Sequence, residues 1–264
     1  MNSRVLLSVL LWMSGGVAFS QTALTSTTLE SRRAAVDPDL SADPDSAFWN
    51  GMPSVALDKH IITGEPMPNL AAEVRSRWTD KNLYFLFVGK FASIRTKPET
   101  DLTAETYRLW TWDCFEAYVD NIDDPPHRYR ELQMSPRGEW LDLDIDSTRE
   151  RIGGNDERLW DSGMKVKARI DEAKKVWVGE MQVPWTAFMS RAPRAGDLIP
   201  VNFYRQDGAP RGRGMPVTPG DSGRTFTAWL PTGAWNPHRP ETFGLLQLTA
   251  DRSIEWEERG RRLR

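Results

Sequence analysis

The chain has 264 residues, and its 34 Lys and Arg residues against 37 Asp and Glu residues give a formal net charge of −3. A mildly acidic chain has no overall basic field with which to hold nucleic acid. Cys114 is the only cysteine, so an intramolecular disulfide is excluded and stability must come from a hydrophobic core. A chain of this length can bury such a core within one domain.

The first twenty residues have the pattern of a secretory signal peptide. Arg4 precedes a short apolar stretch, and Ala18 and Ser20 stand at the −3 and −1 positions of a cleavage site. The apolar stretch is too short to span a membrane. We therefore expect removal of residues 1–20, which leaves a monomeric secreted or periplasmic protein that begins at Gln21 and has no membrane attachment.

Composition divides the rest of the chain into three parts. Residues 21–36 are rich in Thr and Ser and predict a flexible lead-in. Residues 37–250 form the single domain, which contains a loop rich in Gly and Pro at 206–224. Residues 251–264 form a charged tail, which we expect to be frayed and solvated.

Short alternating segments predict an all-β domain. In residues 71–78, Ala72, Val74 and Trp78 alternate with charged residues, whereas residues 82–89 are apolar on both faces, as in a covered central strand. Further strands are expected at residues 113–120, 128–134, 139–146, 164–170, 175–183, 199–205, 226–230 and 243–249.

Turn residues separate these segments. Residues 79–82 and 171–174 predict hairpin turns, and Pro184 is suited to start one or two turns of helix. Many short strands joined by turns predict an antiparallel β-sandwich, jelly-roll-like, with one or two short helical turns.

The acidic and His residues define no metal site by their spacing. Asp142, Asp144 and Asp146 are spaced as in a calcium loop, but Ser147 stands where the loop requires Gly. A strand explains the same spacing, with the three acids in water and the apolar residues between them facing inward. The three His residues show no zinc spacing.

Aromatic residues give the main functional indication, because ten of the twelve Trp residues lie between residues 49 and 235. A sugar ring has apolar C–H faces and polar hydroxyl edges, so flat aromatic surfaces beside a few charged groups suit it. Trp110 precedes the strand-like run at 113–120, and Trp235 precedes the segment 236–244. These two Trp residues predict a sugar clamp.

The order of segments over residues 37–249 resembles the family 9 carbohydrate-binding modules. Examples are Trp-Thr-Trp-Asp-Cys-Phe-Glu at 110–116 and Pro-Glu-Thr-Phe-Gly at 240–244. The other matching segments are 43–49, 78–84, 129–132, 136–138, 183–185, 201–205 and 229–231. The resemblance rests on the order of all these segments, since each segment alone is a weak motif.

The resemblance implies a function and a site. Modules of this family are β-sandwiches that bind chain ends or short sugars, so we expect a secreted domain that recognises plant-type polysaccharide or oligosaccharide and assists its breakdown. No catalytic residues and no required cofactor are implied, although related modules carry a structural calcium. Position by position, the walls would be Trp110 and Trp235, and the polar contacts would be Glu116 and Arg130. Asp113 and Asn202 are further candidates.

Strand alternation predicts that Glu116 needs a positively charged partner. The Glu116 side chain points away from Phe115 and Ala117. It emerges from a mostly apolar face, where an ionised carboxylate needs a counter-charge. Arg130 is the expected partner. The alternative is that Trp110 is a core residue and the Glu116–Arg130 ion pair only supports the architecture.

Two other function classes stay open. A glycoside hydrolase would use two carboxylates among Asp113, Glu116 and Glu131 as acid and base. A haem b carrier would use Met134 and His238 as its iron ligands.

Overall fold

The structure is a computed structural model that describes residues 27–120, 123, 127–146, 148, 160–208 and 224–251. The strands within these ranges are β1 (Thr28–Arg33), β2 (Ser54–Leu57), β3 (Lys59–His60), β4 (Ala72–Trp78), β5 (Asn82–Lys90), β6 (Cys114–Asp120), β7 (Arg128–Met134), β8 (Trp140–Asp146), β9 (Lys165–Asp171), β10 (Val176–Pro184), β11 (Leu198–Asp207), β12 (Thr225–Ala228) and β13 (Gly244–Thr249). Four single 3-10 turns accompany them, η1 (Pro68–Leu70), η2 (Leu109–Thr111), η3 (Trp185–Ala187) and η4 (Pro240–Thr242). The expected signal peptide, most of the loop at 206–224 and the tail beyond residue 251 lie outside the described residues.

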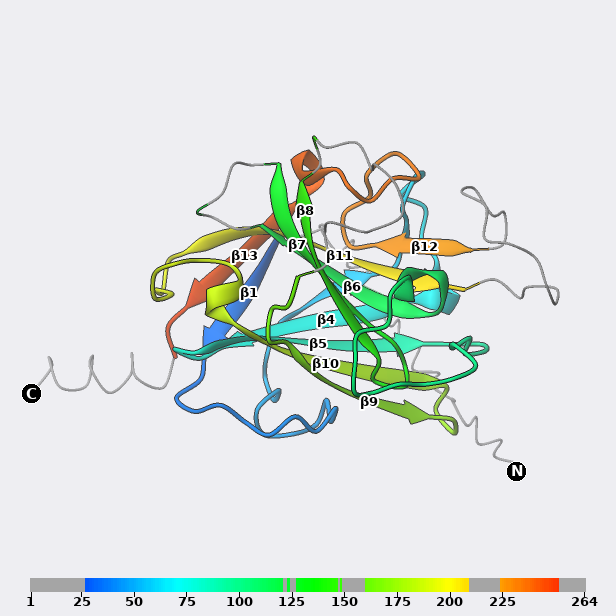
Figure 1. The fold of residues 1–264 in the computed structure, drawn as a ribbon, viewed down its shortest axis with the longest axis horizontal. Helices are drawn as coiled ribbons and strands as arrows, with labels where there is room; N and C mark the ends of the chain where they lie inside the picture. The colour runs from blue at the N-terminus through cyan, green and yellow to red at the C-terminus, as the bar shows by residue number, and fades with distance from the viewer. Residues whose placement is uncertain are drawn as a thin grey trace, which may run out of the picture.

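One mixed sheet contains these strands, and ten of them follow the order β8-β7-β6-β11-β13-β1-β4-β5-β10-β9 (Figure 1). The sheet folds over on itself, so that β6 and β11 pack against β5 and β10. Phe115 stacks on Phe87 and Trp177 with ring centroids 4.8 and 3.8 Å apart, and Phe203 meets Phe85 edge-on at 5.2 Å. The main hydrophobic core therefore lies between the two halves of the sheet, as between the layers of a sandwich.

Strand β1 joins the two halves of the sheet, and its pairing shows that two predictions are wrong. It runs parallel to β13 on one side and to β4 on the other. Leu29 is buried in the main core, and the Ser31 and Ser76 hydroxyls hydrogen bond at 2.9 Å. The prediction of a wholly antiparallel sheet is therefore wrong, and so is the flexible lead-in for residues 28–33. Pairing with distant strands orders a segment whose own sequence is mostly polar.

The remaining strand predictions are confirmed. Every expected segment contains a strand, the hairpins at 79–82 and 171–174 are present, and η3 is the expected helical turn. One detail is wrong, because Asp142 does not face water. Its carboxylate is fully buried and accepts hydrogen bonds from Ser162 N at 3.2 Å and Ser162 Oγ at 2.5 Å.

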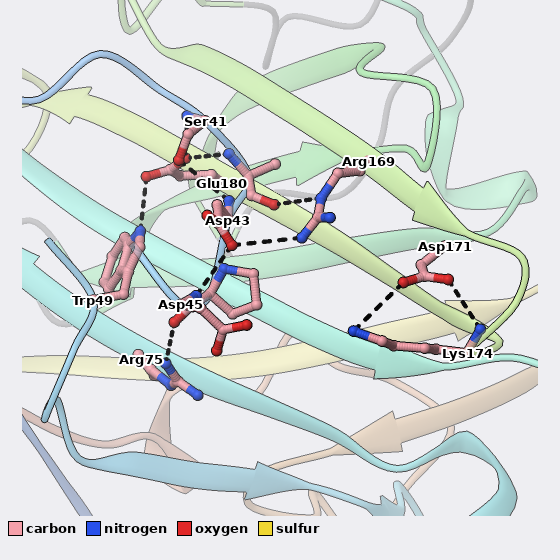
Figure 2. Close-up of polar contacts among 11 residues, drawn as sticks. Ser41, Asp43, Asp45, Trp49, Arg75, Arg169, Asp171, Lys174 and Glu180 are labelled. Atoms are coloured by element: carbon pink, nitrogen blue, oxygen red, sulfur yellow. Dashed lines mark hydrogen bonds and ion pairs between the residues drawn. The ribbon is translucent and has the colours of Figure 1, made fainter. Parts of the chain in front are cut away.

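The segment before β2 is fixed to the outer face of β10 by a buried carboxylate (Figure 2). Glu180 accepts hydrogen bonds from the backbone N–H groups of Ser41 and Ala42 at 2.8 and 2.7 Å and from Trp49 Nε1 at 2.8 Å. Three donors satisfy a carboxylate that would otherwise be costly to bury. A small second core covers this contact, formed by Ala42, Trp49, Tyr84, Leu86 and Val178.

A third cluster lies on the face of β6, β7 and β11 opposite the main core. Alternation in β6 explains the two faces, since Phe115 and Ala117 enter the main core whereas Cys114 and Tyr118 enter this cluster. We call it the aromatic floor, and its buried residues are Ile61, Leu109, Cys114, Tyr118, Tyr129, Leu141, Leu143, Ile145, Tyr204, Phe226 and Ala228. Among the described residues, no helix has the length and apolar character needed to cross a membrane.

Candidate functional site

Both predicted clamp residues border the aromatic floor. Trp110 lies in η2, packs against floor residues and meets Tyr107 edge-on with ring centroids 5.5 Å apart. Trp235 lies between β12 and β13, where its ring is 6.0 Å from Phe226 and 6.2 Å from His60. Trp235 is 36% exposed and Trp110 is partly buried. Each ring is thus supported by protein on one side and reaches solvent, as a sugar-stacking surface must.

The loop that carries Trp235 is held by two residues of β11. Asn202 donates from Nδ2 to Leu230 O at 2.9 Å and accepts from Leu230 N at 3.2 Å. The Tyr204 hydroxyl donates to Pro237 O at 3.2 Å. Asn202 is fully buried, and both ends of its amide are used in these and neighbouring contacts. Its place in the site is therefore to position the Trp235 loop.

Asp113 also has a local structural role. It is fully buried, and its two oxygens accept hydrogen bonds from Gly208 N at 2.6 Å and from Arg95 N at 2.8 Å. Burial raises the pKa of Asp113 to about 6, although the two backbone donors oppose the change. The carboxyl ties the residues before β6 to the end of β11.

Glu116 lies on the floor side of β6, as alternation predicts, but it is fully buried. Its Oε1 accepts from Gln206 Nε2 at 2.7 Å and from the Cys114 thiol at 3.5 Å. Its Oε2 is buried and has no hydrogen-bond partner among the described residues. Burial raises the pKa of Glu116 to about 8, and the negative charge of Glu131 adds to the effect.

Glu131 lies on the same face of the sheet as Glu116, and His238 lies next to Glu131. The antiparallel register places Tyr118 opposite Glu131 and Glu116 opposite Gln133, whose amide donates to the Glu131 carboxylate. His238 Nδ1 is 4.0 Å from Glu131 Oε2 and 2.7 Å from the Tyr129 hydroxyl. From the sequence, these two residues are predicted only in the alternative functions, because their approach to the site depends on strand register.

Arg130 is not brought to Glu116, and the expected ion pair between them is wrong. Arg130 is opposite Val119 in the sheet, so its side chain projects from the face opposite to that of Glu116. There it forms an ion pair with Asp144, donates to Ala187 O at 3.2 Å and lies 4.7 Å over the Trp160 ring. These contacts make Arg130 part of the scaffold.

A different arginine reaches the floor side. Arg224 precedes β12, and its Nη1 donates to Trp110 O at 2.7 Å and to Gln206 Oε1 at 3.1 Å. Gln206 in turn donates to Glu116. The positive charge of Arg224 slightly opposes the rise in the pKa of Glu116. Sequence reasoning missed Arg224 because it ends the segment rich in Gly and Pro, where no periodic pattern assigns a face.

The haem alternative finds no common site. Met134 lies in the main core, where its sulfur is so close to Gly179 that an added Cβ there would lie 2.6 Å away. His238 stacks on Tyr118 on the opposite face, with ring centroids 5.5 Å apart. The two side chains therefore cannot ligate one iron. No group of three or more His, Cys, Asp or Glu residues within the described ranges is arranged to hold a metal ion.

Comparisons with known proteins show which solved structures have a similar fold. No protein-family model matches the chain, and no curated protein matches its sequence. A Bacteroides uniformis protein proposed to bind carbohydrate has a similar structure, with a TM-score of 0.62 and 20% identity over 84% of this chain and 98% of the other. This likeness is one of fold.

Family 9 carbohydrate-binding modules from Caldicellulosiruptor kristjanssonii are also similar. A complex with cellotriose gives a TM-score of 0.57 at 13% identity over 85% of this chain and 94% of the module. A complex with glucose gives 0.55 at 12% identity over 84% and 96%. The chain therefore has the fold of these modules, and the resemblance predicted from its sequence is confirmed at the level of fold.

Proposed function

We propose that this protein is a secreted carbohydrate-binding domain that holds a short sugar, or the end of a chain, between Trp110 and Trp235. The observation that carries the proposal is that two supported, partly exposed Trp rings border the same aromatic floor. The relatives in fold were solved with cellotriose and glucose, which supports a glucose-type ligand here. We also infer a jelly-roll-like sandwich for the fold.

Each part of the site contributes a distinct interaction. The Trp rings stack on the C–H faces of the sugar and remove apolar surface from water. Charged groups beside them exchange hydrogen bonds with hydroxyls, and such bonds are stronger than those between neutral groups. Asn202 and Tyr204 hold the Trp235 loop before the ligand arrives, which reduces the entropy lost on binding.

The contacts favour binding over hydrolysis. A glycosidase needs two carboxyl groups about 5–10 Å apart that both face an open cleft. Glu116 and Asp113 are fully buried and Glu131 nearly so. Asp113 uses both oxygens on backbone N–H groups, and Glu116 accepts from Gln206. Their surroundings suit a polar support beneath a binding surface.

Isothermal titration calorimetry of the mature protein with glucose and cellotriose tests the proposal. We expect saturable binding with no release of new reducing ends during the titration. A glycan array on the same preparation then ranks sugars that differ in linkage and ring type. Absence of binding to every sugar on the array contradicts the proposed function.

A further inference from the structure

We infer that Arg224, and not Arg130, supplies the guanidinium that contacts the sugar, and that Gln206 positions this guanidinium by bridging it to Glu116. The inference rests on the proposed function and names two residues of its site. It begins from a continuous chain of hydrogen bonds. Arg224 joins Trp110 O to Gln206 Oε1, and Gln206 Nε2 reaches Glu116 Oε1.

This chain of contacts connects Trp110, one wall of the proposed clamp, to the buried carboxyl of Glu116. Arg224 bonds to the backbone of Trp110 itself, so the guanidinium lies next to the residue that forms one wall of the proposed clamp. A ring stacked on Trp110 directs its hydroxyls outward from its edge, which is where a guanidinium can donate to them. The partial exposure of Arg224 leaves it accessible from solvent.

The guanidinium also keeps donors for a ligand. An arginine has five N–H donors in a planar fork, and the two bonds described above use only Nη1. Nε is buried, so the donors that remain for a ligand are those of Nη2. A pair of neighbouring hydroxyl oxygens on a sugar matches such a fork better than a single acceptor does.

Gln206 has a fixed amide orientation for the same reason. Its oxygen faces the Arg224 donor and its nitrogen faces the Glu116 acceptor, so the opposite orientation would place like groups together. Gln206 thereby links the buried carboxyl of Glu116 to Arg224 and holds the guanidinium in place. Gln206 is a positioning residue, whereas Arg224 contacts the ligand.

Arg130 provides the matched control, because its charge is the same and its contacts lie on the other face. It is bound to Asp144, to Ala187 O and to the Trp160 ring. Replacing it should therefore change stability and leave the sugar site unaltered. Arg224 has no carboxylate partner among the described ion pairs, so its replacement costs the fold only the hydrogen bonds to Trp110 O and Gln206 Oε1.

The test compares Arg224→Ala, Arg224→Lys, Gln206→Ala and Arg130→Lys by calorimetry with cellotriose and by thermal melts. We expect Arg224→Ala to weaken binding roughly tenfold or more with only a small fall in melting temperature, since a hydrogen bond from a charged donor to the ligand is lost. Arg224→Lys keeps the charge but loses the fork, so its affinity should fall between those of Arg224→Ala and the wild type. Gln206→Ala should weaken binding several-fold, and Arg130→Lys should leave affinity within about twofold while lowering the melting temperature.

A panel of monodeoxyglucoses separates ligand contact from structural support. The wild type should bind the sugar that lacks the Arg224-contacting hydroxyl less tightly than glucose, and Arg224→Lys and Arg224→Ala should reduce or abolish that difference. Wild-type binding with unchanged affinity in Arg224→Ala, or an unaltered deoxy pattern in both variants, overturns the inference and leaves the proposed function standing. If the wild type binds no sugar, the proposed function fails and the inference fails with it.

Discussion

The Glu116→Gln substitution should change how the stability of the domain depends on pH. The folded protein raises the pKa of Glu116 from 4.5 to about 8, mainly because the carboxyl is buried and then because Glu131 lies near it. A raised pKa means that the folded state holds the proton more tightly than the unfolded state. The resulting stability is fully present below pH 4.5, declines as the pH rises and is lost above about pH 8.

The magnitude follows from the same values. A difference of about 3.5 in pKa, at about 1.4 kcal/mol per unit, gives an upper limit of about 5 kcal/mol. Movement of Gln206 and Arg224 toward the ionised carboxylate reduces this cost, so we expect about 2 kcal/mol. Gln does not titrate, and the free energy of unfolding of Glu116→Gln relative to wild type should therefore rise by that amount between pH 4 and pH 9.

Urea unfolding curves of both proteins at several pH values measure this difference. Other groups, including Asp113 and Glu105, titrate in both proteins, so only the difference between the two curves reports on Glu116. Parallel stability curves across the whole range would show that Glu116 is ionised in the folded protein, and would refute the reasoning.

Three further substitutions test the scaffold and the support of the clamp. Glu180→Ala leaves three N–H donors, two of them buried, without their acceptor and should destabilise the fold by about 3 kcal/mol in urea unfolding, whereas an unaltered midpoint would contradict the role of this carboxylate. Gly179→Ala places a Cβ 2.6 Å from the Met134 sulfur and should cost about 1–3 kcal/mol by thermal melting, whereas a constant melting temperature would contradict this tight packing. Asn202→Ala frees the Leu230 contacts and should weaken sugar affinity several-fold in calorimetry, with about 1–2 kcal/mol lost from stability; full affinity would mean that the Trp235 loop does not need this anchor.

Local patterns in the sequence predicted most of the sheet. Alternation and turn residues locate β4, β5 and the later strands, because each of these has a repeating apolar pattern that a single window reveals. Strand β1 escapes this reasoning, since Leu29 is its one large apolar residue facing the main core and its order comes from pairing with β13 and β4. The short strands β2 and β3 give too few residues to show a period.

The placement of the candidate site residues was predicted in part, for a related physical reason. Trp110, Trp235 and Glu116 border one face because their own segments determine where they lie. Whether Arg130 or Glu131 meets Glu116 depends on the register between β6 and β7, and a shift of one residue exchanges the faces. That register cannot be read from either strand alone.

The most direct test of the sugar clamp compares Trp110→Ala and Trp235→Ala with Trp185→Ala. Trp185 is buried in the main core and donates from Nε1 to Thr79 O at 2.8 Å, so it is a matched control for the loss of an indole ring. Calorimetry with cellotriose and thermal melts are made on the same three samples. We predict that each clamp variant loses about 1–3 kcal/mol of binding free energy with a nearly unchanged melting temperature. Trp185→Ala should lose about 3–5 kcal/mol of stability and retain its affinity. Wild-type sugar affinity in both clamp variants would contradict the account.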